Sequence, residues 1–119
     1  MGRRNEKPKA YAHSDYLSLI GKTKNKGKRS MLIDYANKEQ IEAIAECIDN
    51  ILRGNVPLNK NEAKKLKKHK NTMRTVTDRH TPIRRKKDVL RQQGGFLSTL
   101  IPIAISALGS LVSGFMNKA

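Results

Sequence analysis

The stretch NKEQIEAIAECIDNILRG, residues 37–54, decides the fold. Its isoleucines recur at steps of three and four residues, which is the period of a helix with one apolar face. Asn37 and Gln40 have the spacing of a capping box at the start of such a helix, and Gly54 is suited to follow its end. Glu and Asp residues stand between the isoleucines. The pattern therefore predicts an acidic amphipathic helix over residues 37–53.

The segment that follows this helix is strongly basic. Between residues 54 and 93 there are thirteen Lys or Arg residues against three acidic ones. Asn59 and Thr81 are suitable helix caps, and Pro82 suits the first position of a helix. Three short helices with thin apolar faces are therefore expected to pack on the acidic helix in a small all-α unit. They are expected near residues 60–70, 71–78 and 82–92.

The first thirty residues have the composition of a disordered chain. They contain nine Lys or Arg residues against two acidic ones, with frequent Gly, Asn, Ser and Pro. No apolar run after the basic start is long enough for a secretory signal. The expected organisation is a disordered basic arm over 1–30, a helical basic domain over 31–93, and a tail over 94–119.

The tail begins with Gly94 and Gly95, followed by 21 residues without a charge, 96–116. As a straight helix that stretch would be roughly 31 Å long, about the thickness of a bilayer core. We expect a separate apolar helix after a glycine hinge, because the rest of the chain offers little apolar surface to cover it. Such a helix would span a membrane, lie in one as a fusion or lytic segment, or bury itself against protein. Its apolar residues are Phe96, Leu97, Leu100, Ile101, Ile103, Ile105, Leu108, Leu111, Val112 and Phe115.

The formal net charge of +15 in 119 residues indicates an anionic partner. Nucleic-acid phosphates and anionic lipid headgroups are the two candidates. Lys and Arg residues that surround short helices suit contacts with the phosphates of double-stranded DNA, without sequence preference. The residues expected to bind nucleic acid are Lys22, Lys24, Lys26, Lys28, Arg29, Lys60, Lys64, Lys65, Lys67, Lys68, Lys70, Arg74, Arg79, Arg84, Arg85, Lys86, Lys87 and Arg91.

Two other functions fit parts of the sequence. Short basic helices joined by turns are also typical of a helix-turn-helix regulator, in which Asn71, Arg74 or Arg79 would reach base edges. The charge-free stretch 96–116 would alternatively make the protein a membrane-anchored or membrane-lytic one.

Catalysis finds little support in the sequence. His13, His69 and His80 are scattered in basic surroundings and are expected at the surface. Cys47 lies beside the apolar face of the predicted helix and is expected to be a packing residue. With no zinc spacing and no phosphate-binding loop motif, we expect a non-enzymatic protein without a cofactor or a metal.

The C-terminal part resembles a viral family. Residues 93–97, QGGFL, and 100–109, LIPIAISALG, are similar to the end of the adenoviral precursor of core protein mu. The order of a basic segment, Gly-Gly and an apolar tail is similar to that of the same precursor. Residues 52–58, LRGNVPL, and the Lys-rich run that leads to residues 94–97, GGFL, also resemble the small basic proteins of Polinton or Maverick elements, which are adintovirus-like. The resemblance implies a DNA-condensing core or minor capsid protein of the virion, found in the virion and the host nucleus. A host membrane is the alternative location.

The same resemblance implies cleavage near Gly94 and Gly95 by a viral cysteine protease. Adenoviral proteases favour an aliphatic residue two positions before the Gly-Gly pair, and Gln92 stands there in this chain. The helix over 37–53 has no counterpart in the mu precursor. It is expected to dock capsid proteins or to serve self-association, and the oligomeric state stays open.

Overall fold

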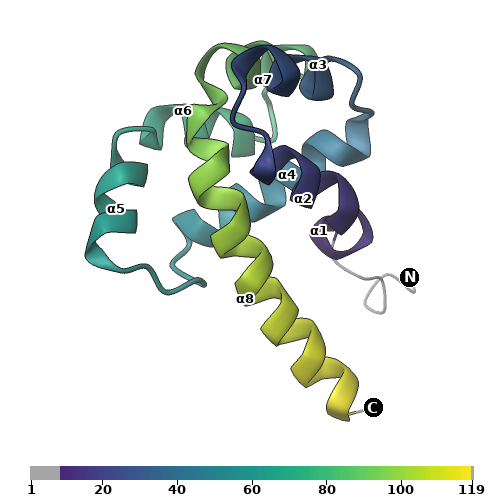
Figure 1. Ribbon diagram of the computed structural model, residues 1–119, viewed down its shortest axis with the longest axis vertical. Coiled ribbons are helices and arrows are strands. Elements are labelled where there is room, and N and C mark those ends of the chain that lie inside the picture. The colour runs from purple at the N-terminus through teal and green to yellow at the C-terminus, as the bar shows by residue number, and fades with distance from the viewer. Residues whose placement is uncertain (1–8, 119) are drawn as a thin grey trace.

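The structure is a computed structural model that describes the backbone of residues 9–118 and the side chains of residues 9–107. All regular structure in the described residues is helical, which confirms the all-α prediction (Figure 1). The helices are α1 (Lys9–Ala12), α2 (Ser14–Lys22), α3 (Lys26–Asp34), α4 (Lys38–Leu52), α5 (Lys60–Lys67), α6 (Lys70–Thr77), α7 (Ile83–Gln93), the 3-10 turn η2 (Gly94–Phe96) and α8 (Leu97–Lys118).

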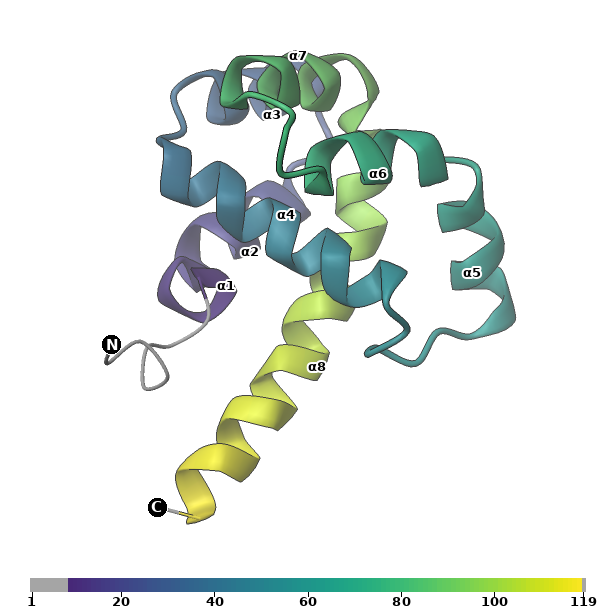
Figure 2. The same cartoon turned by 180° about the vertical axis from the view of Figure 1, so that it is seen from behind.

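Helix α4 runs through the middle of the molecule and contacts α1, α2, α6, α7 and α8 (Figure 2). The predicted capping box is present, because the Asn37 side chain accepts from the Gln40 amide while the Gln40 side chain accepts from the Asn37 amide. At the other end Gly54 has φ +75°, a left-handed conformation that glycine adopts without strain. The isoleucines of α4 are buried, so the helix predicted over 37–53 is confirmed.

The three basic helices lie close to their predicted bounds. A turn at Lys68 and His69 separates α5 from α6. Asn59 and Glu62 form a capping box at the start of α5. Helix α7 begins after Pro82, which is its N-cap in place of Thr81 and makes no side-chain capping bond. Each of these helices buries only a few apolar side chains, as the sequence predicts.

The N-terminal segment differs from the expected disordered arm. From Lys9 onward it forms α1, α2 and α3, whereas residues 1–8 lie outside the described part. Leu17 and Ile20, three positions apart on α2, are fully buried, and the core also includes Ala10. The many lysines dominate the composition and hide this short apolar face. A few large side chains at helical spacing suffice when a partner helix is available.

That partner helix is α8, whose first turns are not separate from the rest of the molecule. Leu97, Leu100 and Ile101 are fully buried, and α8 packs most extensively on α2. Gly21 allows the close approach, because a Cβ atom there would lie 3.0 Å from Cγ2 of Ile101. The tail was expected to be separate because the sequence pattern did not reveal the apolar face of α2. That face covers the first turns of α8. One core extends from Ala10 to Ala104, across the expected boundaries.

The second half of α8 leaves the body of the molecule in both views (Figures 1 and 2). Ile103 and Ile105 are half-buried at the point where it leaves. The side chains of Leu108, Leu111, Val112 and Phe115 lie outside the described residues. No helix in the described part of the chain combines the length and the apolar character needed to cross a bilayer.

Candidate nucleic-acid interface

Most of the cations predicted to bind nucleic acid are exposed. They fall into two groups, one around the α2–α3 turn and one on α5, α6, α7 and their connections. The first group consists of Lys22, Lys24, Lys26 and Lys28. The second, which we call the α5–α7 cation surface, consists of Lys60, Lys64, Lys65, Lys67, Lys68, Lys70, Arg74, Arg79, Arg84 and Arg85.

The α5–α7 cation surface lacks acidic partners in the part of the chain that the structure describes. Within the described residues, none of its members forms an ion pair. The nearby acids have other roles: Glu62 caps α5, Asp78 accepts from the His80 amide, and Asp88 pairs with Arg91. Ten cations without acidic partners favour binding of a polyanion, which would release their counterions.

The helix dipole stabilises or destabilises these cations, depending on the end of the helix at which they lie. Lys64, Lys65 and Lys67 lie in the last turn of α5, where the helix dipole stabilises cations. Arg84 and Arg85 lie in the first turn of α7, where the dipole disfavours cations and no acid is present. A phosphate near the start of α7 would therefore relieve an unfavourable arrangement.

Two of the predicted cations are not at the surface. Arg29 and Lys86 are each only 7% exposed. Arg29 lies against Gly94, and its Nε atom is buried without a hydrogen-bond partner. Both side chains lie on the inner faces of their helices, so the prediction that they contact DNA is not supported by their positions.

Two further predicted cations, Lys87 and Arg91, connect α7 to α3. The Lys87 ammonium donates to the backbone carbonyl of Asp34 at 3.0 Å. The Arg91 guanidinium donates to Oδ1 of Asp34 at 3.0 Å and also pairs with Asp88. These half-buried side chains hold two helices together, and the charge of Arg91 is already neutralised in part.

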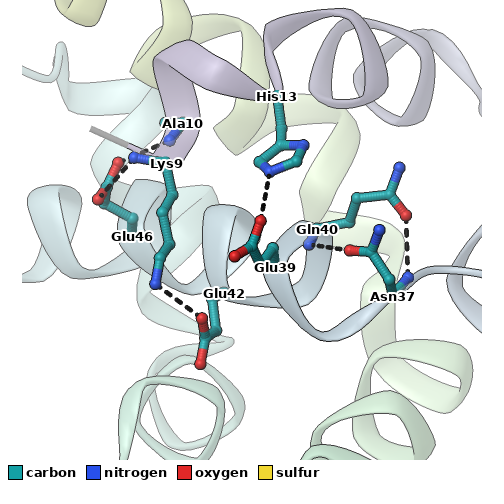
Figure 3. A network of polar contacts seen from close by, with 8 residues as sticks. All are labelled: Lys9, Ala10, His13, Asn37, Glu39, Gln40, Glu42 and Glu46. Atoms are coloured by element: carbon teal, nitrogen blue, oxygen red, sulfur yellow. Dashed lines mark hydrogen bonds and ion pairs between the residues drawn. The ribbon is translucent and has the colours of Figure 1, made fainter. Parts of the chain in front are cut away.

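The acidic face of α4 receives the N-terminal helix α1 (Figure 3). Glu46 accepts from the Ala10 amide at 2.7 Å and thereby caps the start of α1. Lys9 Nζ lies 2.8 Å from Glu42 Oε1, and His13 Nε2 lies 3.6 Å from Glu39 Oε1. Glu39, Glu42 and Glu46 therefore contact residues near α1 in the same chain. The sequence did not predict this role.

The contact between Lys9 and Glu42 alters both titrations. The hydrogen bond from the Lys9 ammonium holds the pKa of the Glu42 carboxyl below its usual value, and the same bond raises the pKa of Lys9. The two residues are 33 positions apart, so no local pattern reveals the pair.

Cys47 is buried in the core, and burial raises the pKa of its thiol to about 12. A thiol that stays protonated is a weak nucleophile, which agrees with a packing role. In the described part of the chain, no three His, Cys, Asp or Glu side chains lie close enough together to hold a metal ion.

The expected processing site lies inside the folded unit. Gly94 and Gly95 belong to the η2 turn, and Gly94 is buried. The two residues that follow, Phe96 and Leu97, are also buried. Proteases generally bind an extended chain, so cleavage after Gly95 requires this turn to unwind. Processing at this site stays a prediction.

No protein family, no curated protein and no solved structure matches this chain.

Proposed function

We propose that this chain is a non-enzymatic DNA-binding protein of the virion core or minor capsid type, which condenses double-stranded DNA without sequence specificity. The observation that carries the proposal is the α5–α7 cation surface, whose members are exposed and form no ion pair among the described residues. Lysine binds phosphate as a compact point charge, and contacts to phosphates carry no sequence information, so a lysine-dominated surface favours sequence-independent binding.

The proposal includes the setting that the family resemblance implies. The protein would act in the virion and the host nucleus, with the apolar end of α8 contacting capsid proteins. A viral cysteine protease would act near Gly94 and Gly95. The projecting half of α8 supports a contact outside this molecule, because it leaves the body of the protein (Figure 1).

The test is a salt titration of DNA binding with the full chain. Fluorescence anisotropy with a labelled random-sequence duplex should show affinity falling by orders of magnitude between about 0.05 M and 0.2 M salt. Replacing Lys64, Lys65, Lys67 and Lys68 with Gln should reduce the slope of log affinity against log salt by about 3.6, since each lost phosphate contact removes about 0.9. Affinity that stays flat with salt would overturn the proposal.

A competition experiment separates this function from that of a helix-turn-helix regulator. Unlabelled duplexes of scrambled sequence should compete as well as the labelled duplex itself. A strong preference for one sequence would instead favour direct base contacts by Asn71, Arg74 or Arg79, all of which are exposed.

A membrane-surface function is the second candidate, and the projecting apolar half of α8 favours it (Figure 2). In this case the exposed lysines would meet anionic lipid headgroups while the end of α8 enters the interface. Flotation with anionic vesicles should then depend on residues 108–119. Equal flotation of the full chain and a 1–107 chain would exclude this role of the tail.

A further inference from the structure

A cavity of about 230 Å³ lies between the α5–α6 turn and the start of α8. One part of its wall is apolar and is formed by Leu66 and Phe96, which are 3% and 4% exposed. The imidazole of His69 stacks on the Phe96 ring with the centroids 5.1 Å apart. This stack connects the α5–α6 turn to η2, so the wall is part of the packed core.

The polar groups around the cavity are all able to donate hydrogen bonds. Lys65 and Lys68 contribute ammonium groups, His69 a ring N–H and Thr99 a hydroxyl. Among the described residues, neither lysine forms an ion pair, and neither the His69 ring nor the Thr99 hydroxyl makes a hydrogen bond. No acidic side chain lines the cavity.

This lining selects an anion that also has an apolar part. Two ammonium groups beside a ring N–H and a hydroxyl favour a group with several acceptor oxygens and a negative charge. A phosphodiester fits, because its oxygens can meet the donors while the adjoining sugar carbons lie against Leu66 and Phe96. The larger cavity beside α8 differs in chemistry, since Glu62 contributes to its lining.

We propose that this cavity binds one phosphodiester group of the DNA backbone, held by Lys65, Lys68, His69 and Thr99. The inference rests on the proposed DNA-binding function and assigns one fixed phosphate position within it. The remaining cations of the α5–α7 cation surface then contact the polyanion diffusely. This position would fix how the protein is oriented on the duplex.

The test compares two pairs of substitutions on the same helix end. Lys65→Gln with Lys68→Gln removes two charges from the cavity, whereas Lys64→Gln with Lys67→Gln removes two charges that do not line it. The first pair should lower duplex affinity about tenfold more than the second, because charge-assisted hydrogen bonds are lost along with charge. Equal losses would overturn the fixed site and leave diffuse DNA binding intact.

Two further variants test the ring N–H of His69 and the hydroxyl of Thr99. His69→Phe retains a ring to stack on Phe96 but removes the nitrogens, and Thr99→Val removes the hydroxyl from a side chain of similar shape. Each should weaken duplex binding about threefold to tenfold with an unchanged melting temperature. Wild-type affinity in both variants would contradict the assignment.

Binding to vesicles that contain phosphatidylserine tests whether the phosphodiester belongs to a lipid headgroup instead of DNA. If the Lys65 and Lys68 pair affects vesicle binding and not duplex binding, a headgroup is the occupant and the DNA assignment is wrong. If the wild-type chain does not bind duplex DNA at all, the proposed function itself fails, which distinguishes that outcome from failure of the cavity alone.

Discussion

Two sides of the molecule use basic residues in different ways. On the core side, formed by α1, α2, α4 and the start of α8, large apolar side chains are buried and Lys9 has an acidic partner. On the side of α5 to α7, each helix buries few apolar residues, and the members of the α5–α7 cation surface form no ion pair within the described residues. In both views α1 and α5 lie at opposite edges of the molecule (Figures 1 and 2). Stability and the proposed DNA binding should therefore be separable, and substitutions can test this.

The largest expected effect comes from cutting the chain after Gly95. A chain of residues 1–95 lacks Leu97, Leu100 and Ile101, which are fully buried. Truncation of one such side chain to Ala costs about 2–5 kcal/mol, and a whole domain is stable by about 5–15 kcal/mol. We expect 1–95 to show no cooperative unfolding by circular dichroism in urea.

A chain of residues 1–107 is the matched control, because it retains the buried half of α8 and loses only the projecting half. It should unfold cooperatively, near the midpoint of the full chain. Cooperative unfolding of 1–95 would mean that the start of α8 contributes little to the core.

A smaller effect on stability is expected from a substitution that obstructs the close packing of α2 on α8. In Gly21→Ala the new Cβ would lie 3.0 Å from Ile101 Cγ2. Overpacking costs about 1–3 kcal/mol, and the better helix propensity of Ala returns somewhat less than 1 kcal/mol. Urea denaturation should therefore show a net loss of about 1 kcal/mol, with duplex affinity unchanged.

Gly95→Ala is the control for this substitution, because nothing lies within 4 Å of a Cβ atom there. Its stability should remain within about 0.5 kcal/mol of wild type. If Gly21→Ala is no less stable than Gly95→Ala, the contact between α2 and α8 is looser than the structure indicates.

The smallest expected effect concerns the bond between Lys9 and Glu42. Because folding lowers the pKa of Glu42, the contribution of this residue is present at pH values above its unfolded pKa and is lost as pH falls through the folded pKa. Both side chains are partly exposed, so Glu42→Gln should cost only about a few tenths of a kcal/mol at neutral pH. Urea denaturation of both proteins should show this difference vanishing in acid. A difference that persists in acid would assign it to packing.

Local signals in the sequence predicted α4 and the basic helices well. The capping box at Asn37 and the glycine at 54 act within one turn, so they determine helix ends without tertiary contacts. The N-terminal helices were not predicted, and the apolar C-terminal helix was predicted without its packing on α2, since the burial of these two segments depends on each other. Neither α2 nor the start of α8 reveals in isolation that the other will cover it.

The sequence predicted all members of the α5–α7 cation surface, but two other cations that were predicted to bind DNA, Arg29 and Lys86, are buried. Arg29 stands four residues before Ile33, and Lys86 stands three before Val89, so both share a face with buried residues. A helical projection of these segments would have placed them inward. The grouping of Lys65, Lys68, His69 and Thr99 around one cavity had no such signal, because it joins segments about thirty residues apart.

The contact between Gly21 and Ile101 joins positions about eighty residues apart. The core therefore cannot close until residue 101 has been synthesised, after every helix from α1 to α7 has been made. Contacts between such distant segments slow folding relative to helical proteins with local pairing. During synthesis the lysines and the apolar face of α2 are thus exposed together, before the helix that covers this face is present.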